Sequence, residues 1–337
     1  MFRSLRFWAA ATVGILLIVL FLLVTDLSEV ADAFREASYW YVAPAIVVLF
    51  LSFFLRCYRL SILMRPVVAI SPRRLFSYSI IGYMANNLLP ARAGELVRAY
   101  VLGERERVSI MGTLGTIAVE RLFDGCVLVL MLFTAGAIVG FGDSRLQAIA
   151  IAAASLFSVS LVVFYWLTFR EERAHRVAEF LLERFPGKLA ERLRPHVRSI
   201  VGALRSVHDW RSVILVSLFS ILGWTVEAGA YAIVGLAFGI KVSFAHYVLL
   251  LAAANLSIIV PTFFGGTGPF EWAAKLVMVN AGLAGGLAAA YAIVAHAVVV
   301  APATIVGLVL LWIFGIPIAR LANIRNDSTE EHRPVTL

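Results

Sequence analysis

The chain has 337 residues, of which 61% are hydrophobic and 15% are charged, and its mean hydropathy is +0.90. This composition lies far outside the range of soluble domains, so we expect a protein embedded in a bilayer. The net charge of +8 does not indicate nucleic-acid binding, because the Lys and Arg residues concentrate in particular loops, as the positive-inside rule predicts for membrane proteins.

Long apolar segments follow one another along the chain. A helix that crosses a bilayer needs about 20 apolar residues, and we predict six spans, at residues 7–25, 39–55, 109–139, 148–168, 212–239 and 284–314. Two further hydrophobic regions, 76–89 and 247–260, are too short to cross comfortably and run into Pro, Gly and charge. The expected fold is an all-α polytopic membrane protein with about six full spans and two re-entrant broken-helix units, which enter the membrane and return.

Charges between the spans predict the orientation. Arg3 and Arg6 precede the first span, whereas the next loop, "TDLSEVADAFREAS", is acidic. Basic residues follow the second span, and the basic stretch 170–211 follows the fourth. The basic residues after the second span are Arg56, Arg59, Arg65, Arg73 and Arg74. Because Lys and Arg favour cytoplasmic loops, we expect both the N-terminus and the polar C-terminal tail, 321–337, to be cytoplasmic.

The first segment has a second interpretation. Small residues in "ADA" at 31–33 fit a cleaved signal peptide, but the apolar run is long and its flank is acidic, which favours a membrane span. Cys57 and Cys126 are the only cysteines, so we expect no disulfide framework and no metal site. No nucleotide-binding loop is present, and we expect no cofactor.

An internal repeat organises the membrane domain, residues 1–320. Regions 39–141 and 211–315 share the order of a span, a short hydrophobic piece, a Gly-containing turn, a short helix and a long span. The matched positions lie 169 to 176 residues apart, and they are Asn86 with Asn255, Pro90 with Pro261, and Glu95 with Glu271. Three full spans separate the two units, so the second is expected to be inverted relative to the first.

Inverted repeats with broken helices that meet near the midplane are typical of transporters. Irregular backbone at membrane depth must be buried in protein or line a wet cavity. The alternative is that both short pieces are interfacial helices and that the repeat is a coincidence between Gly- and Ala-rich stretches.

The segment 170–210 is predicted to form a basic amphipathic helix on the cytoplasmic face. Apolar residues recur at helical spacing opposite Arg192, Arg194 and Arg198. Such a helix fits either anionic headgroups or another cytoplasmic loop.

Ionisable residues inside the hydrophobic segments are costly and need a partner or a wet cavity. The third span carries Glu120, Arg121 and Asp124, of which the two carboxylates share one helix face while Arg121 can reach a carboxylate on a neighbouring helix. Glu227 and His296 lie in later spans. Each of these is either a tie between helices or part of a substrate site; for His296 a satisfied hydrogen bond is the favoured interpretation and proton coupling the alternative.

The two helix breaks are candidate headgroup sites. Proline ends each short piece and glycine permits the tight turn, and the helix that follows offers unpaired N–H groups to a phosphate or carboxylate. Arg92 is placed to pair with a phosphate, whereas Arg98 is expected to be a surface or headgroup contact. The break residues in this candidate site are Asn86, Asn87, Arg92, Gly94, Asn255, Gly265, Gly266 and Gly268.

Glu95 and Glu271 begin the two short helices, where a carboxylate often caps the helix or offsets its dipole. Because both halves carry this Glu within hydrophobic sequence, the other interpretation is that they bind a cationic group or titrate during transport.

The motifs "NNLLPARAGELVRAYVL", "VERLFDG" and "PTFFGGTGPFEWA" make the chain similar to the membrane portion of the lysylphosphatidylglycerol synthase and flippase family, over about residues 10–318. The resemblance implies lipid translocation in a prokaryotic cytoplasmic (inner) membrane, with aminoacylated phosphatidylglycerol as the substrate of the best-understood members. Bifunctional relatives carry an additional soluble aminoacyl-transfer domain after the membrane part; we expect none here, so the synthase activity is not carried over. The turn "FFGGTG" also departs from the "PGGIG" of many relatives.

We therefore expect a flippase or transporter, and not an enzyme, that moves a lipid with a polar, anionic headgroup between leaflets. We expect membrane lipids as its partners. The sequence leaves open whether the chain forms a homo-oligomer. Two alternatives remain. The first is a membrane transferase that acts on lipid-linked substrates and uses its carboxylates as acid and base. The second is a non-catalytic assembly subunit.

Overall fold

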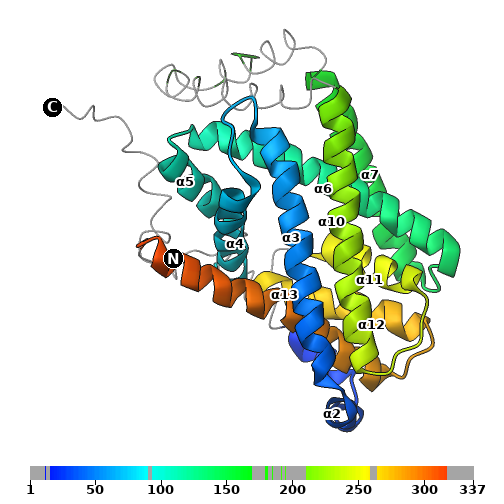
Figure 1. Ribbon diagram of the computed structural model, residues 1–337. Helices are drawn as coiled ribbons and strands as arrows, with labels where there is room; N and C mark the ends of the chain where they lie inside the picture. The colour runs from blue at the N-terminus through cyan, green and yellow to red at the C-terminus, as the bar shows by residue number, and fades with distance from the viewer. Residues whose placement is uncertain are drawn as a thin grey trace.

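The computed structural model describes residues 16–89, 93–168, 210–258 and 264–316, with a few isolated positions besides. Every regular element in these ranges is a helix (Figure 1). The first half contains α2 (Leu27–Glu36), α3 (Val42–Met64), α4 (Pro72–Leu88), α5 (Gly94–Glu106), α6 (Ile110–Val139) and α7 (Ser144–Thr168). The second half contains α10 (Trp210–Ala237), α11 (Phe244–Ser257), α12 (Pro269–Asn280) and α13 (Gly285–Ile313). The 3-10 turns η1 (Tyr39–Tyr41) and η4 (Phe264–Gly266) precede α3 and α12.

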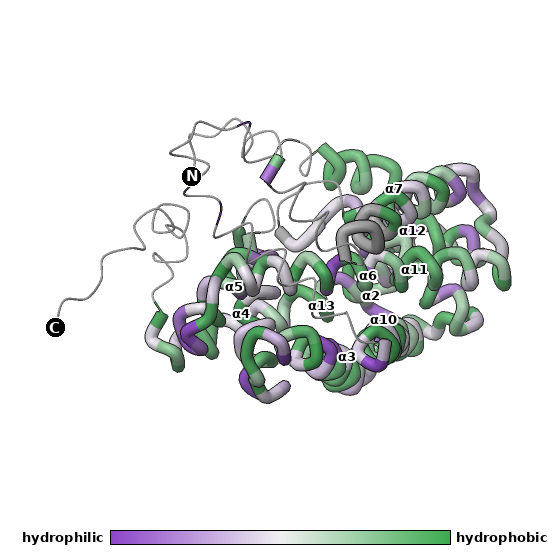
Figure 2. Tube along the Cα trace, turned by 90° about the horizontal axis from the view of Figure 1, so that it is seen from above, coloured by the Kyte–Doolittle hydropathy of each residue, from purple (hydrophilic) through white to green (hydrophobic). Residues whose placement is uncertain are grey.

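Four helices are long and apolar enough to cross a membrane, namely Tyr39–Met64, Ile110–Val139, Trp210–Ala237 and Gly285–Ile313. They confirm the second, third, fifth and sixth predicted spans. The fourth predicted span lies in α7, and the first is described only from residue 16. Hydrophobic residues occupy most of the length of the described helices (Figure 2). The total of six spans stays a prediction.

The second span is longer than the sequence suggested. We expected it to end at residue 55 and placed Arg56 and Arg59 in a cytoplasmic loop, but α3 continues to Met64 and both arginines are buried inside it. The placement was wrong because two arginines in an apolar run were taken as the end of the span. Carboxylates on other helices pair with both arginines, so the helix continues through them.

Both short hydrophobic pieces are helices that stop at the predicted breaks. The helix α4 ends at Leu88 and α11 at Ser257, and α5 and α12 begin beyond the breaks. At the second break Gly265, Gly266 and Gly268 all have φ between 67° and 101°, the left-handed region in which side chains are strained. Pro90, Arg92 and Pro261 lie outside the described residues.

The two halves pack through matching helices. The helices α3 and α10 lie side by side (Figure 1). The helix α4 packs on α5 and on α13, and in the same way α11 packs on α12 and on α6. Small residues permit these close approaches; a Cβ on Gly307 of α13, for example, would lie 2.3 Å from Cβ of Met84 on α4.

The helix α2 lies between the first segment and α3 and is amphipathic. Asp26 caps it by accepting hydrogen bonds from the backbone N–H groups of Ser28 (2.9 Å) and Glu29 (3.4 Å). Glu29 Oε2 in turn accepts from the N–H of Gly286 (2.9 Å) at the start of α13. Trp40, 89% exposed, follows in an aromatic turn. Exposed aromatic residues beside a span are typical of the membrane interface.

The predicted amphipathic segment 170–210 and the tail 321–337 lie almost entirely outside the described residues.

Candidate functional site

Arg59 of α3 is the centre of a buried cluster of charges. Its guanidinium donates to Glu120 Oε1 (2.7 Å) and to both carboxylate oxygens of Asp124, of which Oδ2 is at 3.2 Å, and to Ser220 Oγ (2.8 Å). Arg59 is fully buried. We did not predict it as a site residue. The signal was available, because the apolar pattern continues for several residues beyond it in "RCYRLSILM".

Glu120 joins three helices. Besides Arg59 of α3, it accepts from Arg98 of α5, with Nη2 at 2.5 Å from Oε2, and from Arg121 at 3.3 Å. The expected surface position of Arg98 is therefore wrong, since the side chain is buried and paired. The sequence of α5 shows that Arg98 lies on this helix. It does not show that the adjacent α6 presents a carboxylate to Arg98.

Arg121 pairs differently from its prediction. We expected it to reach a carboxylate on a neighbouring helix, but it lies 3.3 Å from both Glu120 and Asp124 of its own helix. The neighbouring helix supplies Arg59 to these carboxylates instead. The side chain of Arg121 is 40% exposed, and its Nε has no hydrogen-bond partner. The guanidinium groups of Arg56, Arg59 and Arg98 are almost fully buried, so Arg121 is the most exposed arginine of the cluster.

A second ion pair joins the two halves of the molecule. Arg56 Nη2 of α3 donates to Glu227 Oε2 of α10, and both residues are buried. The guanidinium of Arg56 also lies 3.7 Å from the ring centroid of Trp224, a cation–π contact. Trp224 Nε1 donates to Asp124 Oδ1 (2.8 Å). The indole therefore connects this pair to the cluster around Arg59.

A cavity of about 580 Å³ opens beside the cluster, which is within the size range of ligand sites. Residues of α5, α6, α7, α10 and α11 form its wall. They are Glu95, Ala118, Arg121, Leu122, Asp124, Gly125, Leu128, Phe157, Trp224, Asn255 and Leu256. The cavity brings together four of the predicted site residues, Glu95, Arg121, Asp124 and Asn255, the last from the second half of the chain. One part of the wall is charged and another is apolar.

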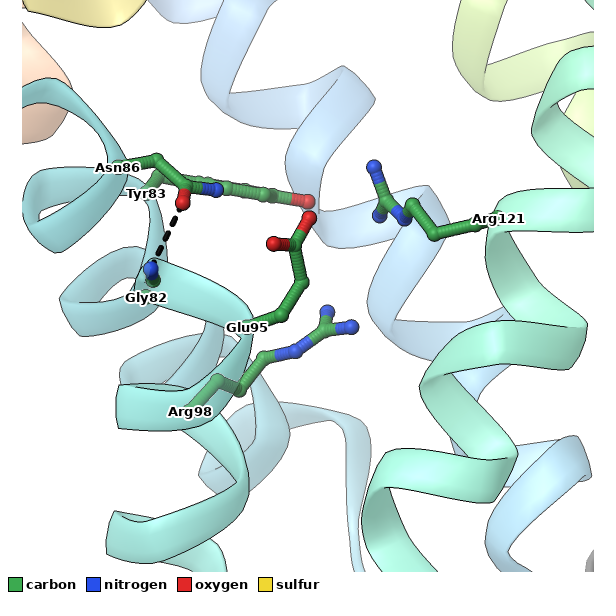
Figure 3. Close-up of a pocket in the computed structure, with 7 residues that line it drawn as sticks. Gly82, Tyr83, Asn86, Glu95, Arg98 and Arg121 are labelled. Carbon is green, nitrogen blue, oxygen red and sulfur yellow. Dashed lines mark hydrogen bonds between the residues drawn. The ribbon is translucent and has the colours of Figure 1, made fainter. Parts of the chain in front are cut away.

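A smaller cavity of about 10 Å³ lies at the first helix break, with room for about one water molecule (Figure 3). Its lining consists of Gly82, Tyr83, Asn86, Gly94, Glu95, Arg98 and Arg121. Glu95 and Arg121 line both cavities. In Figure 3 the Glu95 carboxylate points toward the space between Tyr83, Arg98 and Arg121.

The asparagines at the first break make structural contacts. Asn86 Oδ1 accepts a hydrogen bond from the backbone N–H of Gly94 (2.8 Å), so it satisfies one of the free donors at the start of α5. Asn87 Nδ2 donates to Val300 O (3.2 Å) and Thr304 Oγ1 (3.0 Å) of α13. The two side chains thus hold the break to its own helix and to the second half.

The second break is closed by its glutamate. Glu271 Oε2 accepts from the N–H of Gly268 (2.7 Å), and Oε1 lies 2.6 Å from His296 Nδ1 on α13. The His296 ring stacks on Phe270 at 4.4 Å. This is the capping geometry that we weighed for Glu271 and the hydrogen bond that we favoured for His296.

The predicted site residues consequently occupy three places. One set surrounds the large cavity and the first break. Glu227 pairs with Arg56 between the halves. Gly265, Gly266, Gly268, Glu271 and His296 belong to the second break, and none of them lines either cavity. Whether any of these residues binds a substrate stays a prediction.

Comparisons with known proteins give a consistent picture. A protein-family model described as "Lysylphosphatidylglycerol synthase TM region" matches residues 7–307. A UPF0104 membrane protein of Methanothermobacter thermautotrophicus is 27% identical over 84% of this chain and 88% of its own length. A second UPF0104 membrane protein of that organism is 28% identical, over 65% of this chain and 67% of its own length. No solved structure shows significant similarity.

A further relative is named as a glycosyltransferase, AglD of Haloferax volcanii. It is 28% identical over 88% of this chain, but the match covers only 52% of its own length. Almost half of that protein therefore has no counterpart in the match.

Proposed function

The chain belongs to the family of the lysylphosphatidylglycerol synthase TM region, and from this premise we propose that it is a lipid flippase, which moves a lipid with a polar, anionic headgroup between leaflets. The family is one of multi-pass membrane proteins with a lipid-related function. The observation that carries the proposal is the cavity of about 580 Å³ among the spans, with charged and apolar walls. A charged wall at membrane depth fits a headgroup, and an apolar wall fits the start of the acyl chains.

The matching helix contacts support an inverted repeat as the moving part. Each half contributes a span, a broken pair of short helices and a second span. The first short helix of each pair packs on the second span of the other half, and the second short helix packs on the second span of its own half. In transporters built in this way, rocking of one repeat against the other exposes a central site to each side in turn. We propose the same for this chain, with N- and C-termini in the cytoplasm and the protein in the cytoplasmic (inner) membrane.

A translocation assay tests the proposal. The purified protein is reconstituted in vesicles that contain fluorescent phosphatidylglycerol, and the fraction of label that a membrane-impermeant quencher reaches is followed over time. We expect the wild type to increase the exchange rate at least about tenfold over empty vesicles, and Arg121→Gln to abolish the increase. Arg74→Gln is the matched control, because Arg74 is 58% exposed and lines neither cavity. Wild-type vesicles that exchange no more label than empty ones contradict the proposal.

A membrane transferase is the second candidate, since the chain is similar to a protein named as a glycosyltransferase. Acid and base catalysis needs a carboxylate that can exchange a proton with the substrate. Glu120 and Asp124 are instead paired with arginines. Formation of a glycosylated product by the purified protein from a lipid-linked sugar donor would favour the transferase.

A further inference from the structure

The charges of the described residues that form the cluster and line its two cavities balance one another. Among the described residues, four guanidinium groups and four carboxylates belong to the cluster and its cavities. They are Arg56, Arg59, Arg98 and Arg121, and Glu95, Glu120, Asp124 and Glu227. An unbalanced charge in such a low-dielectric region is costly. An anion that enters the cavity therefore adds one uncompensated negative charge unless a positive charge accompanies it.

Two members of this set differ from the other six. The side chain of Arg121 is 40% exposed, whereas those of Arg56, Arg59 and Arg98 are at most 7% exposed, and its two ion pairs with described residues are both 3.3 Å long and lie within its own helix. Glu95 has no hydrogen bond to any described residue and is partly exposed. Both line the large cavity and the small one, so they stand where a headgroup would arrive.

Glu95 is surrounded by side chains of both positive and negative charge. Tyr83 faces it from α4, Arg98 from its own helix and Arg121 from α6 (Figure 3). Across the large cavity lie Asp124 of α6, whose charge is paired with Arg59, and Asn255 of α11. Glu95 and Arg121 are thus opposite charges within electrostatic range of each other at the junction of the two cavities.

We propose that Arg121 binds the phosphate of a monoanionic phosphodiester headgroup and that Glu95 takes up one proton when this headgroup binds. The inference rests on the proposed function. The phosphate brings its negative charge to Arg121 beside the Glu95 carboxylate, and a proton transferred from water or hydronium adds to one oxygen of that carboxylate while no other covalent bond of the protein or lipid changes. The complex is then neutral again. Lipid and proton would cross the membrane together, and a proton gradient would drive the transport.

Glu271 does not compete for this role in the described structure. Its two carboxylate oxygens are occupied by the N–H of Gly268 and by His296, and it lines neither cavity. A zwitterionic headgroup is the other chemistry to be distinguished, because its ammonium group could pair with Glu95 directly and would require no proton.

The test measures binding of phosphatidylglycerol, phosphatidylethanolamine and soluble glycerol phosphate to the purified full chain between about pH 5 and about pH 9. We expect the Kd for phosphatidylglycerol to rise by up to about tenfold per pH unit in the wild type, as for one linked proton. Glu95→Gln, which mimics the protonated side chain, should bind phosphatidylglycerol equally at every pH. Arg121→Gln should lose at least about tenfold in affinity. Glu104→Gln, an exposed position on the same helix, should behave as the wild type does.

Each of the other outcomes overturns one part of the proposal. A pH-independent Kd in the wild type, or an unchanged pH dependence in Glu95→Gln, overturns proton coupling, while translocation in the vesicle assay would leave the flippase function standing. Tighter, pH-independent binding of phosphatidylethanolamine indicates a zwitterionic substrate and also overturns the coupling. Tighter binding of soluble glycerol phosphate than of the lipid rejects the lipid as the source of the phosphate. If phosphatidylglycerol neither binds nor moves, the proposed function fails for this lipid together with the inference.

Discussion

The two helix breaks share a sequence pattern but differ in their hydrogen bonds. At the second break Glu271 caps α12 and pairs with His296, so both carboxylate oxygens are used inside the protein. At the first break Asn86 supplies the cap to Gly94, and Glu95 faces two cavities beside Arg121. Because Asn86 caps α5 at the first break, the Glu95 carboxylate is available for another partner. Two matched positions of the predicted repeat therefore differ in their contacts.

The buried cluster beside the first break is where we expect the largest effect. Arg59→Met leaves Glu120 and Asp124 with less positive charge around them, and removal of one partner from a buried ion pair costs about 3–5 kcal/mol. Denaturation of the purified protein, compared with Arg74→Met at an exposed position, measures this cost. A loss below about 1 kcal/mol would mean that water reaches the cluster and replaces the arginine.

The packing of the first break gives the next largest effect. A Cβ on Gly94 would lie 2.1 Å from Gly82 O and 2.5 Å from Asn86 Oδ1. Gly94→Ala must therefore separate α4 from α5, and overpacking of this kind costs about 1–3 kcal/mol. Gly285→Ala at the start of α13 is the control, because nothing lies within 4 Å of its Cβ position. Equal stability of the two variants would show that the two short helices are not held in contact.

The glutamates themselves provide the sharpest comparison. Glu271→Gln weakens the charged acceptor of Gly268 and His296, so we expect a loss of about 1–2 kcal/mol in the free energy of unfolding. Glu95→Gln breaks no hydrogen bond with a described residue, and its partly exposed charge is expected to contribute about 1 kcal/mol or less. Denaturation curves of the two variants, measured side by side, give both losses in the free energy of unfolding. A larger loss for Glu95→Gln than for Glu271→Gln would reverse the assignment of structural and functional roles.

The smallest effect is expected at Asp26, which lines neither cavity and supplies a baseline for pH dependence. Hydrogen bonds from the Ser28 hydroxyl and from the backbone N–H groups of Ser28 and Glu29 lower the pKa of Asp26. A lowered pKa means that the cap stabilises α2 above the unfolded value of about 3.9, and that this contribution is lost as the pH falls through the folded pKa. When the free energy of unfolding is measured as a function of pH, the curves of wild type and Asp26→Asn should converge only at acidic pH. A constant difference at all pH values would contradict the capping role.

Several features were predictable because they depend on local sequence. Hydropathy located four of the spans, and the prolines and glycines located both breaks. The end of the second span was placed wrongly at residue 55, since Arg56 and Arg59 have the same local appearance whether they face water or a buried carboxylate. The matched residues led to the prediction of a repeat, which stays a prediction, and they did not distinguish Glu95 from Glu271.

The sequence by itself determined that the chain is helical, that it lies in a membrane, that its helices break twice and that charges lie inside apolar segments. Only the tertiary structure decided which charges meet. Arg59 is separated from Asp124 by 65 positions and Arg56 from Glu227 by 171, and such pairs depend on how distant helices rotate and cross. The same holds for the large cavity, whose wall combines Glu95 of the first half with Asn255 of the second. Local periodicity fixes the face on which a side chain lies, whereas the partner of that face is set by packing between helices.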